Sequence, residues 1–493
     1  MKSIGNGVMI RTQAHSLMIV LVVVLVGAAA PIAAAGSVHD AARRGDMHAV
    51  SRQLAGGADV DERNTDGATA LIIAAREGNP ACVELLIGAG ADVAAANHDG
   101  YTALMAAAAN GNLRCLALLL DAGAPLEARN GTGGTALSVA AWAGRYDAME
   151  QFLSAGANTH TADEHGYTPL MMAAFRDGAC VHRLLQAGVD LEARTIDGET
   201  ALMIAAWAGN LAAIDHLARA GANLQARDND GETALTHAAR EGAVETLGAL
   251  IHAGADIEMS NGQGETALML AAGFGSPAGV RLLISRAADV QARSDHGETP
   301  LIHAARRGRI ESLLHLLRAG ALIEARNELG GTALMAAALG GHSRCVGALI
   351  EAGANINAVN DHGYTALMAA AAGGEARALR PLLEAGAAVN ARSKRGSTAL
   401  IAAALNGNFE CLELLVRAGI DVDAPDHRGY TALMAAAWHG SAPCVRLLLA
   451  AQADTGAETE EGRTALQLAR LRRPDDRDRQ PIVDMLVSVA LAE

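Results

Sequence analysis

The pattern of apolar and polar residues along this chain repeats about every 33 residues. The tripeptide Thr-Ala-Leu or Thr-Pro-Leu occurs thirteen times, and successive threonines stand 33 residues apart except for one interval of 32. Self-similarity at such a period indicates a repeat architecture. The thirteen threonines are Thr69, Thr102, Thr135, Thr168, Thr200, Thr233, Thr266, Thr299, Thr332, Thr365, Thr398, Thr431 and Thr464.

Each unit predicts two short helices joined by turns. An Ala-rich apolar stretch such as residues 71–75 follows the threonine, and a glycine such as Gly78 closes it in most copies. A second apolar stretch then ends at a glycine such as Gly90. Another glycine stands two residues before every threonine, where we expect a tight turn with positive φ. Neither helix has enough apolar surface to fold alone, so each unit must pack on its neighbours.

This unit resembles the ankyrin repeat in its 33-residue period and its Thr-Pro-Leu motif. The resemblance covers residues 37–493 and implies an all-α fold, an ankyrin-repeat solenoid of about fourteen helix-turn-helix units joined by β-hairpin-like turns. No copy has the family's histidine directly after the Leu. We therefore expect apolar contacts in place of the hydrogen-bond ladder that this histidine builds. Methionine takes its place in seven copies: Met105, Met171, Met203, Met269, Met335, Met368 and Met434.

The repeat pattern divides the chain into four segments. They are a signal peptide or N-terminal membrane anchor at 1–35, an N-terminal capping repeat at 37–65, twelve ankyrin repeats at 66–461 and a C-terminal capping repeat at 462–493. The copy that begins at Thr168 is one residue short, and we place the missing residue near the end of its second helix. Ala287 and Gln452 stand where other copies have the glycine after the second helix, which predicts strain there.

The first 35 residues differ from the repeats. Lys2 and Arg11 precede an apolar run at 17–30, and three alanines at 33–35 supply the small residues that signal peptidase accepts. The run is shorter than the roughly 20 residues that span a bilayer. This favours a cleaved signal peptide, with an uncleaved membrane anchor as the alternative. Either one predicts export, to the periplasm of a Gram-negative bacterium or to the medium.

Composition and charge support a helical array that binds protein. The chain is 51% hydrophobic but only 2% aromatic, because its apolar residues are mostly Ala and Leu. Its net charge is -15, and no basic stripe occurs, which argues against nucleic acid as a partner. Residues 195–300 hold 14 acidic side chains and 6 arginines, a net charge of 6 - 14 = -8. A basic partner segment would suit this region.

No catalytic or metal-binding motif is present in the sequence, so we expect neither an enzyme nor a cofactor. The histidines, including His237 and His303 in the first helices and several at the turns, are predicted to be solvated surface residues. The cysteines recur at one place in the second helix, where neighbouring copies stand about 10 Å apart, too far for a disulfide. We predict that they are buried thiols. They are Cys82, Cys115, Cys180, Cys345, Cys411 and Cys444.

Aromatic residues recur seven positions after the threonine. Trp142, Phe175 and Trp207 occupy this place in three successive copies, and Trp438 occupies it in a later one. In ankyrin-repeat proteins this place faces the concave groove, as does the residue before the threonine. The resemblance therefore implies aromatic anchors for a partner. The alternative is that these side chains fill space between first helices.

The residue before the threonine is acidic in one part of the chain and aromatic elsewhere. The acidic copies are Glu199, Glu232, Glu265 and Glu298. The aromatic copies are Tyr101, Tyr167, Tyr364 and Tyr430. We predict that the glutamates and the first two tyrosines contact the partner. The alternative is that arginines five residues earlier neutralise the glutamates across the turn; these are Arg194, Arg227 and Arg293.

The sequence therefore predicts a monomeric, exported scaffold that holds a partner protein in a preformed groove. Two other functions remain open at this stage. A structural spacer of the cell envelope would need no specific ligand, and a secreted effector would bind a host protein through the same fold. Contact with a membrane is expected only through the N-terminal segment.

Overall fold

The computed structural model describes residues 36–471 and 479–491, and the predicted signal peptide or anchor lies outside them. Two compact units divide at Glu164 and His165. The described residues form 28 helices in fourteen pairs, which confirms the predicted number of units. Extended structure in this part of the chain is limited to two isolated bridges at the turns. None of the described helices is both long enough and apolar enough to span a bilayer.

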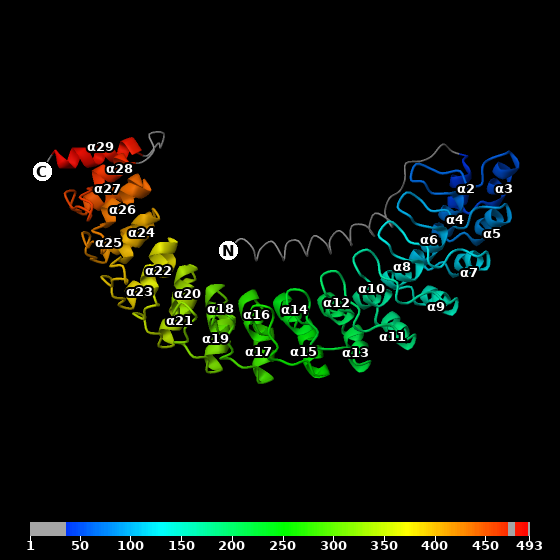
Figure 1. Cartoon of the computed structure of the whole chain (residues 1–493), viewed down its shortest axis with the longest axis horizontal. Coiled ribbons are helices and arrows are strands. Elements are labelled where there is room, and N and C mark those ends of the chain that lie inside the picture. The colour runs from blue at the N-terminus through cyan, green and yellow to red at the C-terminus, as the bar shows by residue number, and fades with distance from the viewer. Residues whose placement is uncertain (1–35, 472–478, 492–493) are drawn as a thin grey trace. The chain divides into compact units, whose positions relative to one another are not determined.

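The first unit contains four helix pairs (Figure 1). Its helices are α2 (Val38–Arg44), α3 (Met47–Ala55), α4 (Ala70–Glu77), α5 (Pro80–Gly88), α6 (Ala103–Asn110), α7 (Leu113–Asp121), α8 (Ala136–Trp142) and α9 (Tyr146–Ser154).

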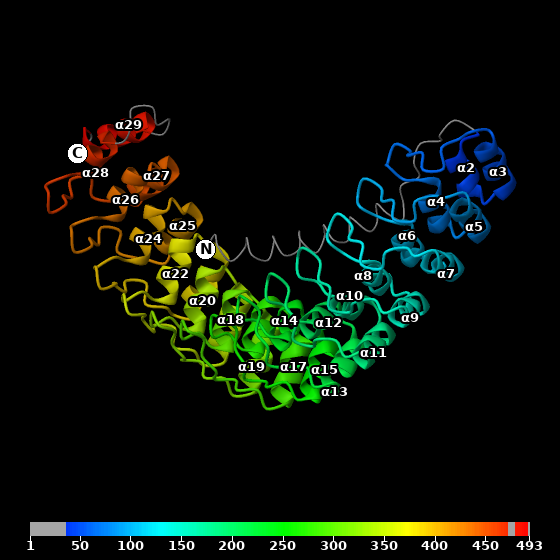
Figure 2. The same ribbon diagram turned by 45° about the vertical axis from the view of Figure 1, so that its right-hand side comes forward.

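The second unit contains ten pairs, and its even-numbered first helices line the inner side of a curve while the odd-numbered second helices line the outer side (Figures 1 and 2). Its helices are α10 (Pro169–Arg176), α11 (Gly178–Gln186), α12 (Ala201–Ala208), α13 (Leu211–Arg219), α14 (Ala234–Glu241), α15 (Val244–Ala253), α16 (Ala267–Phe274), α17 (Pro277–Ser285), α18 (Pro300–Arg306), α19 (Ile310–Arg318), α20 (Ala333–Leu339), α21 (Ser343–Glu351), α22 (Ala366–Gly373), α23 (Ala376–Glu384), α24 (Ala399–Leu405), α25 (Phe409–Arg417), α26 (Ala432–His439), α27 (Ala442–Ala450), α28 (Ala465–Arg470) and α29 (Arg479–Ala490).

The repeated threonine starts every first helix from α4 to α28. In each copy it is the N-cap, with extended backbone, and its hydroxyl accepts the N–H of the third helical residue, as Thr200 does from Met203 at 3.4 Å. This satisfies one of the backbone donors that a helix start leaves free. The Ala-Leu-Met sequence that follows is buried; Leu202 and Met203 are 2% exposed. The threonine therefore fixes where each helix begins and which face enters the core.

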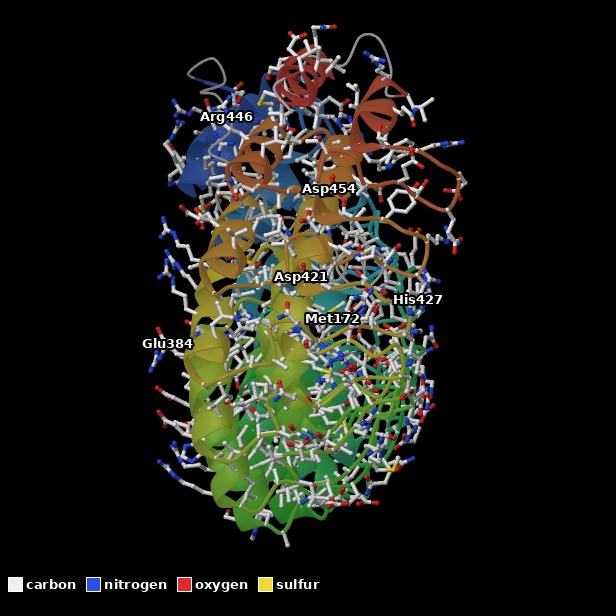
Figure 3. All side chains as sticks on the ribbon, turned by 90° about the vertical axis from the view of Figure 1, so that its left-hand side faces the viewer. Met172, Glu384, Asp421, His427, Arg446 and Asp454 are labelled. Carbon is white, nitrogen blue, oxygen red and sulfur yellow. The ribbon has the colours of Figure 1, made fainter. Side chains whose placement is uncertain are left out.

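The turns before the threonines form a second ordered layer. The glycine two residues before each threonine has positive φ in all thirteen copies, as predicted. A Cβ on Gly231 would lie 2.6 Å from the amide nitrogen of Gly262 in the next turn, so the close approach also requires glycine. Backbone bonds link successive turns within each unit, for example from the Asn229 N–H to the Asp197 carbonyl at 3.0 Å. In Figure 3 His427 lies on this side of the second unit, opposite Glu384 of α23.

The place of the missing histidine is apolar in ten of the thirteen copies, as predicted, and polar in the other three, Ser138, Thr236 and Gln467. Methionines occupy it in seven copies and are at most 7% exposed. Hydrogen bonds between repeats come instead from the turns and from the residue that starts the second helix. Asn408, for example, donates its side-chain amide to the carbonyls of Ala371 and Ala372 in the preceding repeat at 2.8 and 3.0 Å. Apolar packing and polar bridges therefore alternate across each junction between repeats.

The short repeat differs from its prediction. The missing residue is not near the end of α11 but between α10 and α11, where Asp177 ends one helix and caps the next. Its carboxylate accepts the Ala179 N–H at 2.9 Å and the Cys180 thiol at 3.4 Å. Other copies place a glycine and a separate cap residue there. One aspartate does both tasks because its backbone is extended and its side chain is short.

The two predicted strained positions are confirmed. Ala287 and Gln452 have φ of 63° and 60°, and no other non-glycine residue in the described ranges has positive φ. Both occupy the turn after a second helix, where other copies place glycine.

The burial of the cysteines is also confirmed, and all six are free thiols. Burial raises the pKa of Cys411 to about 12 and of Cys115 to about 11, which keeps these thiols protonated at neutral pH.

Candidate functional site

The inner side of the second unit carries two adjoining groups of side chains from the first helices. Most of them come from two repeated places, the residue just before the threonine and the residue seven positions after it; His303, Phe274 and Arg307 stand four or eight positions after it. We call Phe175, Glu199 and Trp207 the aromatic segment. We call the next group the ionic segment; its members are Glu232, Arg240, Glu265, Phe274, Glu298, His303, Arg306 and Arg307.

In the aromatic segment the rings of Phe175 (α10) and Trp207 (α12) are stacked, with centroids 5.5 Å apart and planes 25° apart. Both are half-buried, so each packs on its neighbour and keeps part of its surface in water. Trp142 ends α8 in the first unit and is only 9% exposed there. Trp438 of α26 occupies the same repeat position but is 51% exposed. Phe175 and Trp207 are therefore the predicted aromatic residues that the structure brings together.

The predicted glutamates are largely buried. Glu199, Glu232 and Glu298 are 7%, 4% and 7% exposed, and Glu265 is half-buried. Burying an ionised carboxylate is costly unless cations or hydrogen-bond donors surround it. Each of these carboxylates therefore needs a neighbouring cation or hydrogen-bond donor.

The arginines that were expected to neutralise the glutamates do not do so. Arg194 and Arg227 donate to backbone carbonyls of their own turn and of the next one; Arg194, for example, reaches the Gly198 carbonyl at 3.2 Å and the Arg227 carbonyl at 2.6 Å. Arg293 likewise donates to the Arg326 carbonyl. Their guanidinium groups satisfy main-chain acceptors at the turns, so the prediction of ion pairs across the turn was wrong.

Cations from the first helices compensate the ionic segment instead. Arg240 of α14 forms an ion pair with Glu232 and lies 3.9 Å from Glu265. The side-chain amide of Asn261 donates to both carboxylates, at 3.0 Å to Glu232 and 2.9 Å to Glu265. Arg306 forms an ion pair with Glu298. The arginines at 240 and 306 occupy the place, seven residues after the threonine, that Trp207 occupies in the aromatic segment.

An aromatic ring supports these arginines as well. The guanidinium carbon of Arg240 lies 4.9 Å from the centroid of the Phe274 ring, and that of Arg307 lies 4.8 Å from it. Both distances fall within the range of cation–π attraction. Arg240 is thus held by a carboxylate and by an aromatic ring together.

His303 also belongs to this network, and the assignment of His303 and His237 to the solvated surface was wrong. His303 is 8% exposed, and its Nε2 lies 3.4 Å from Glu298 and 3.7 Å from Glu265. Burial lowers the pKa of His303, with Arg307 and Arg240 acting in the same direction and Glu265 opposing them. His237 contacts Asp228 at 3.0 Å. Of the turn histidines, His165, His296, His362 and His427 are exposed, as expected.

Glu199 is the exception in this row of carboxylates. The Glu199 N–H donates to the Thr195 hydroxyl, and its carbonyl accepts the Thr195 N–H. Its carboxylate, in contrast, has no ion pair and no hydrogen bond within the described residues, and its Oε2 is buried. Arg240 contacts the glutamates of its own repeat and of the following one. By the same register, Phe175 and Trp207 flank Glu199. The place that Arg240 occupies beside Glu232 is therefore occupied beside Glu199 by Trp207.

The predicted tyrosines are half-buried and lie in different units. Tyr101 belongs to the first unit, where burial raises the pKa of its phenol although a hydrogen bond with Asn130 opposes the shift. Tyr167 belongs to the second unit, in the turn before α10. They keep part of their surface in water, as a partner contact would require.

Comparison with known proteins decides the family. A family model described as ankyrin repeats (3 copies) matches overlapping stretches that together run from residue 38 to residue 489. The chain belongs to the ankyrin-repeat family. Its repeats are also similar to the crystal structure of the human ASB11 ankyrin repeat domain, at 28% identity and a TM-score of 0.41 over 44% of this chain and 96% of that one. No curated protein matches the chain.

Ankyrin repeats are generally protein-interaction scaffolds, and nothing in the described residues points to catalysis. No group of three or more His, Cys, Asp or Glu side chains in this part of the chain could hold a metal ion.

Sequence reasoning missed the arginines of the ionic segment. The signal was available, because Arg240 and Arg306 stand in the same place of the ankyrin repeat as the tryptophans.

Proposed function

We propose that this protein is an exported, monomeric scaffold that binds a partner protein along the inner side of its second unit, and that the bound part of the partner is basic. Phe175 and Trp207 serve as aromatic anchors, and the neighbouring acidic region attracts the partner. The stack of these two half-exposed rings is the observation that carries the proposal. Partly exposed aromatic residues on a rigid surface are typical anchors of protein interfaces.

The charge of the region supports a basic partner. Residues 195–300 have a net charge of 6 - 14 = -8, more than half of the chain total of -15. Much of the ionic segment is neutralised within the molecule, so it contributes a shaped polar surface more than a strong field. The long-range attraction comes from the remaining acidic residues, and it would weaken as salt is added.

Affinity capture from crosslinked cell-envelope extract tests the proposal. The wild-type chain is compared with Phe175→Ala/Trp207→Ala, and the affinity of any captured protein is then measured with purified components. We expect one partner whose dissociation constant rises at least about 30-fold in the double variant, since removal of two hot-spot aromatic residues costs at least about 2 kcal/mol.

The matched control is Phe409→Ala. Phe409 is an aromatic residue that is 38% exposed, but it begins the second helix α25. All three proteins should show the same helicity before capture is compared. Equal affinity of the partner for the wild type and the double variant would contradict the proposal and favour a structural spacer or another binding surface.

Export is proposed from the sequence of residues 1–35 alone. Cell fractionation tests it. Recovery of the chain from periplasm or medium, shortened near residue 35, is the expected result. A full-length protein in the cytoplasm would contradict export but would not affect the partner-binding surface.

A further inference from the structure

On the inner surface, one buried glutamate lacks an arginine partner, whereas two glutamates at the same repeat position each have one. Glu199, Glu232 and Glu298 occupy the same repeat position and are all more than nine-tenths buried. Glu232 and Glu298 each pair with an arginine of their own chain. Glu199 has no counterpart of that arginine, because Trp207 stands in its place.

The filled copy shows which chemistry this arrangement accepts. The Arg240 guanidinium pairs with the Glu232 carboxylate and lies 4.9 Å from the centre of the Phe274 ring. A planar cation that both pairs with a carboxylate and stacks on an aromatic face has the properties of a guanidinium more than those of an ammonium group.

We propose that Glu199, Phe175 and Trp207 form a receptor for one arginine side chain of the partner. The guanidinium pairs with the Glu199 carboxylate and packs against the Trp207 ring, in the same combination that Arg240 makes within the chain. This inference rests on the proposed function and names the group that the surface recognises.

The unpaired carboxylate provides the energetic reason. Oε2 of Glu199 and Oε2 of Glu232 are both buried without a hydrogen bond. Glu232 nevertheless has an ion pair with Arg240 and a hydrogen bond from Asn261, whereas the Glu199 carboxylate has neither kind of contact within the described residues. A guanidinium donates hydrogen bonds to a carboxylate in a fixed fork and would supply that compensation. The rings of Phe175 and Trp207 are half-exposed, so a guanidinium from solvent can pack against them.

Fluorine NMR of the full chain labelled with 5-fluorotryptophan tests this inference without an identified partner. The chain has three tryptophans, so three signals are expected, and Trp→Phe variants assign them. The probe is N-acetylarginine amide. The Trp207 signal should shift saturably, with a dissociation constant on the order of millimolar for a single side chain. Trp438, whose repeat has tyrosine in place of the glutamate, should not respond.

Two comparisons identify the charge contact. The neutral citrulline analogue should bind about tenfold more weakly than the arginine probe, and Glu199→Gln should weaken arginine binding by about the same factor. Glu298→Gln is the matched control, since its carboxylate is already occupied by Arg306. It should leave the affinity of the probe unchanged within about twofold.

The proposal is overturned if the Trp207 signal does not respond to arginine, or if Glu199→Gln and the citrulline analogue bind as well as the original pair. Either result would leave the partner-binding function intact when capture still depends on Phe175 and Trp207. Conversely, arginine binding at Trp207 without any captured partner would support the receptor and count against the scaffold function.

Discussion

The aromatic and ionic segments are built on the same repeat and differ mainly in one residue per copy. Both place a glutamate before the threonine and bury it. In two copies of the ionic segment an arginine seven residues after the threonine completes the pair, whereas in the aromatic segment that residue is Trp207. A buried glutamate can therefore be neutralised within the chain in one repeat and open to an external cation in the next, while the backbone stays the same.

The largest effect is expected when the ionic segment loses its cation. Arg240→Leu leaves Glu232, which is 4% exposed, without its ion pair. Loss of one partner from a buried pair costs about 3 kcal/mol. Hydrogen exchange of α14 and α16 measures this locally, which matters because long repeat arrays need not unfold in one step.

The control for this change is Arg417→Leu, which removes an exposed pair with Glu413 in α25 and should cost less than about 0.5 kcal/mol. Similar losses of protection in both variants would remove the distinction between buried and exposed pairs.

The opposite change should convert the aromatic segment into an ionic one. Trp207→Arg places a guanidinium beside Glu199 at the position that Arg240 holds beside Glu232. We expect local stability to rise by about 1–2 kcal/mol, because a buried carboxylate gains a charged hydrogen-bond donor. Hydrogen exchange of α12 measures the gain, and the reference is Trp438→Arg, where no glutamate precedes the threonine. Loss of protection in α12 would show that stacking with Phe175 contributes more than the new pair.

Acid should weaken the ionic segment more than the aromatic one. Burial lowers the pKa of His303 below its ordinary 6.5, so the unfolded chain takes up this proton at a higher pH than the folded chain does. Above about pH 6.5 this histidine is unprotonated in both states, so its contribution to the free energy of unfolding does not change with pH. As pH falls below about 6.5, stability declines by at most about 1.4 kcal/mol per pH unit.

Thermal unfolding between pH 8 and 5 tests this dependence. His303→Gln should flatten the decline, whereas substitution of the exposed His296 by Gln should not. The same slope in wild type and His303→Gln would assign the acid sensitivity to other groups.

The smallest effect concerns the framework that both segments share. Ala287→Gly relieves a left-handed alanine, worth about 1–2 kcal/mol, but adds the flexibility of glycine to the unfolded chain, so a net gain of about 0.5 kcal/mol is expected. Differential scanning calorimetry measures it. Gly254→Ala, at a matching left-handed position after α15, should have the opposite sign. Destabilisation by Ala287→Gly would mean that its methyl group packs usefully despite the strain.

Much of the fold follows from local rules that the sequence displays. Thr69 and its equivalents recur at helix starts, and the turn glycines recur at positive φ, so the number and order of helices were predictable. The place of the deletion was not, because one aspartate at 177 replaces a glycine and a cap together.

The site was harder to predict because it depends on side chains from two repeats. Arg194 and Arg227 are close to the glutamates in sequence, yet their turns direct them to main-chain carbonyls. Arg240 is eight residues from Glu232 in the sequence, near the end of α14, and still forms an ion pair with it. Closeness in sequence therefore pointed to Arg194 and Arg227, which are not partners of the glutamates, and away from Arg240, which is.

The bonds between successive turns have a consequence for how such a chain can change in length. They join an N–H of one turn to a carbonyl of the previous turn, as from Asn229 to Asp197, and so do not depend on which side chain either residue carries. Recombination between gene segments could therefore insert or remove a whole repeat within a unit while these joints re-form with new neighbours. The side chains that distinguish one repeat from another would be inserted or removed together with that repeat.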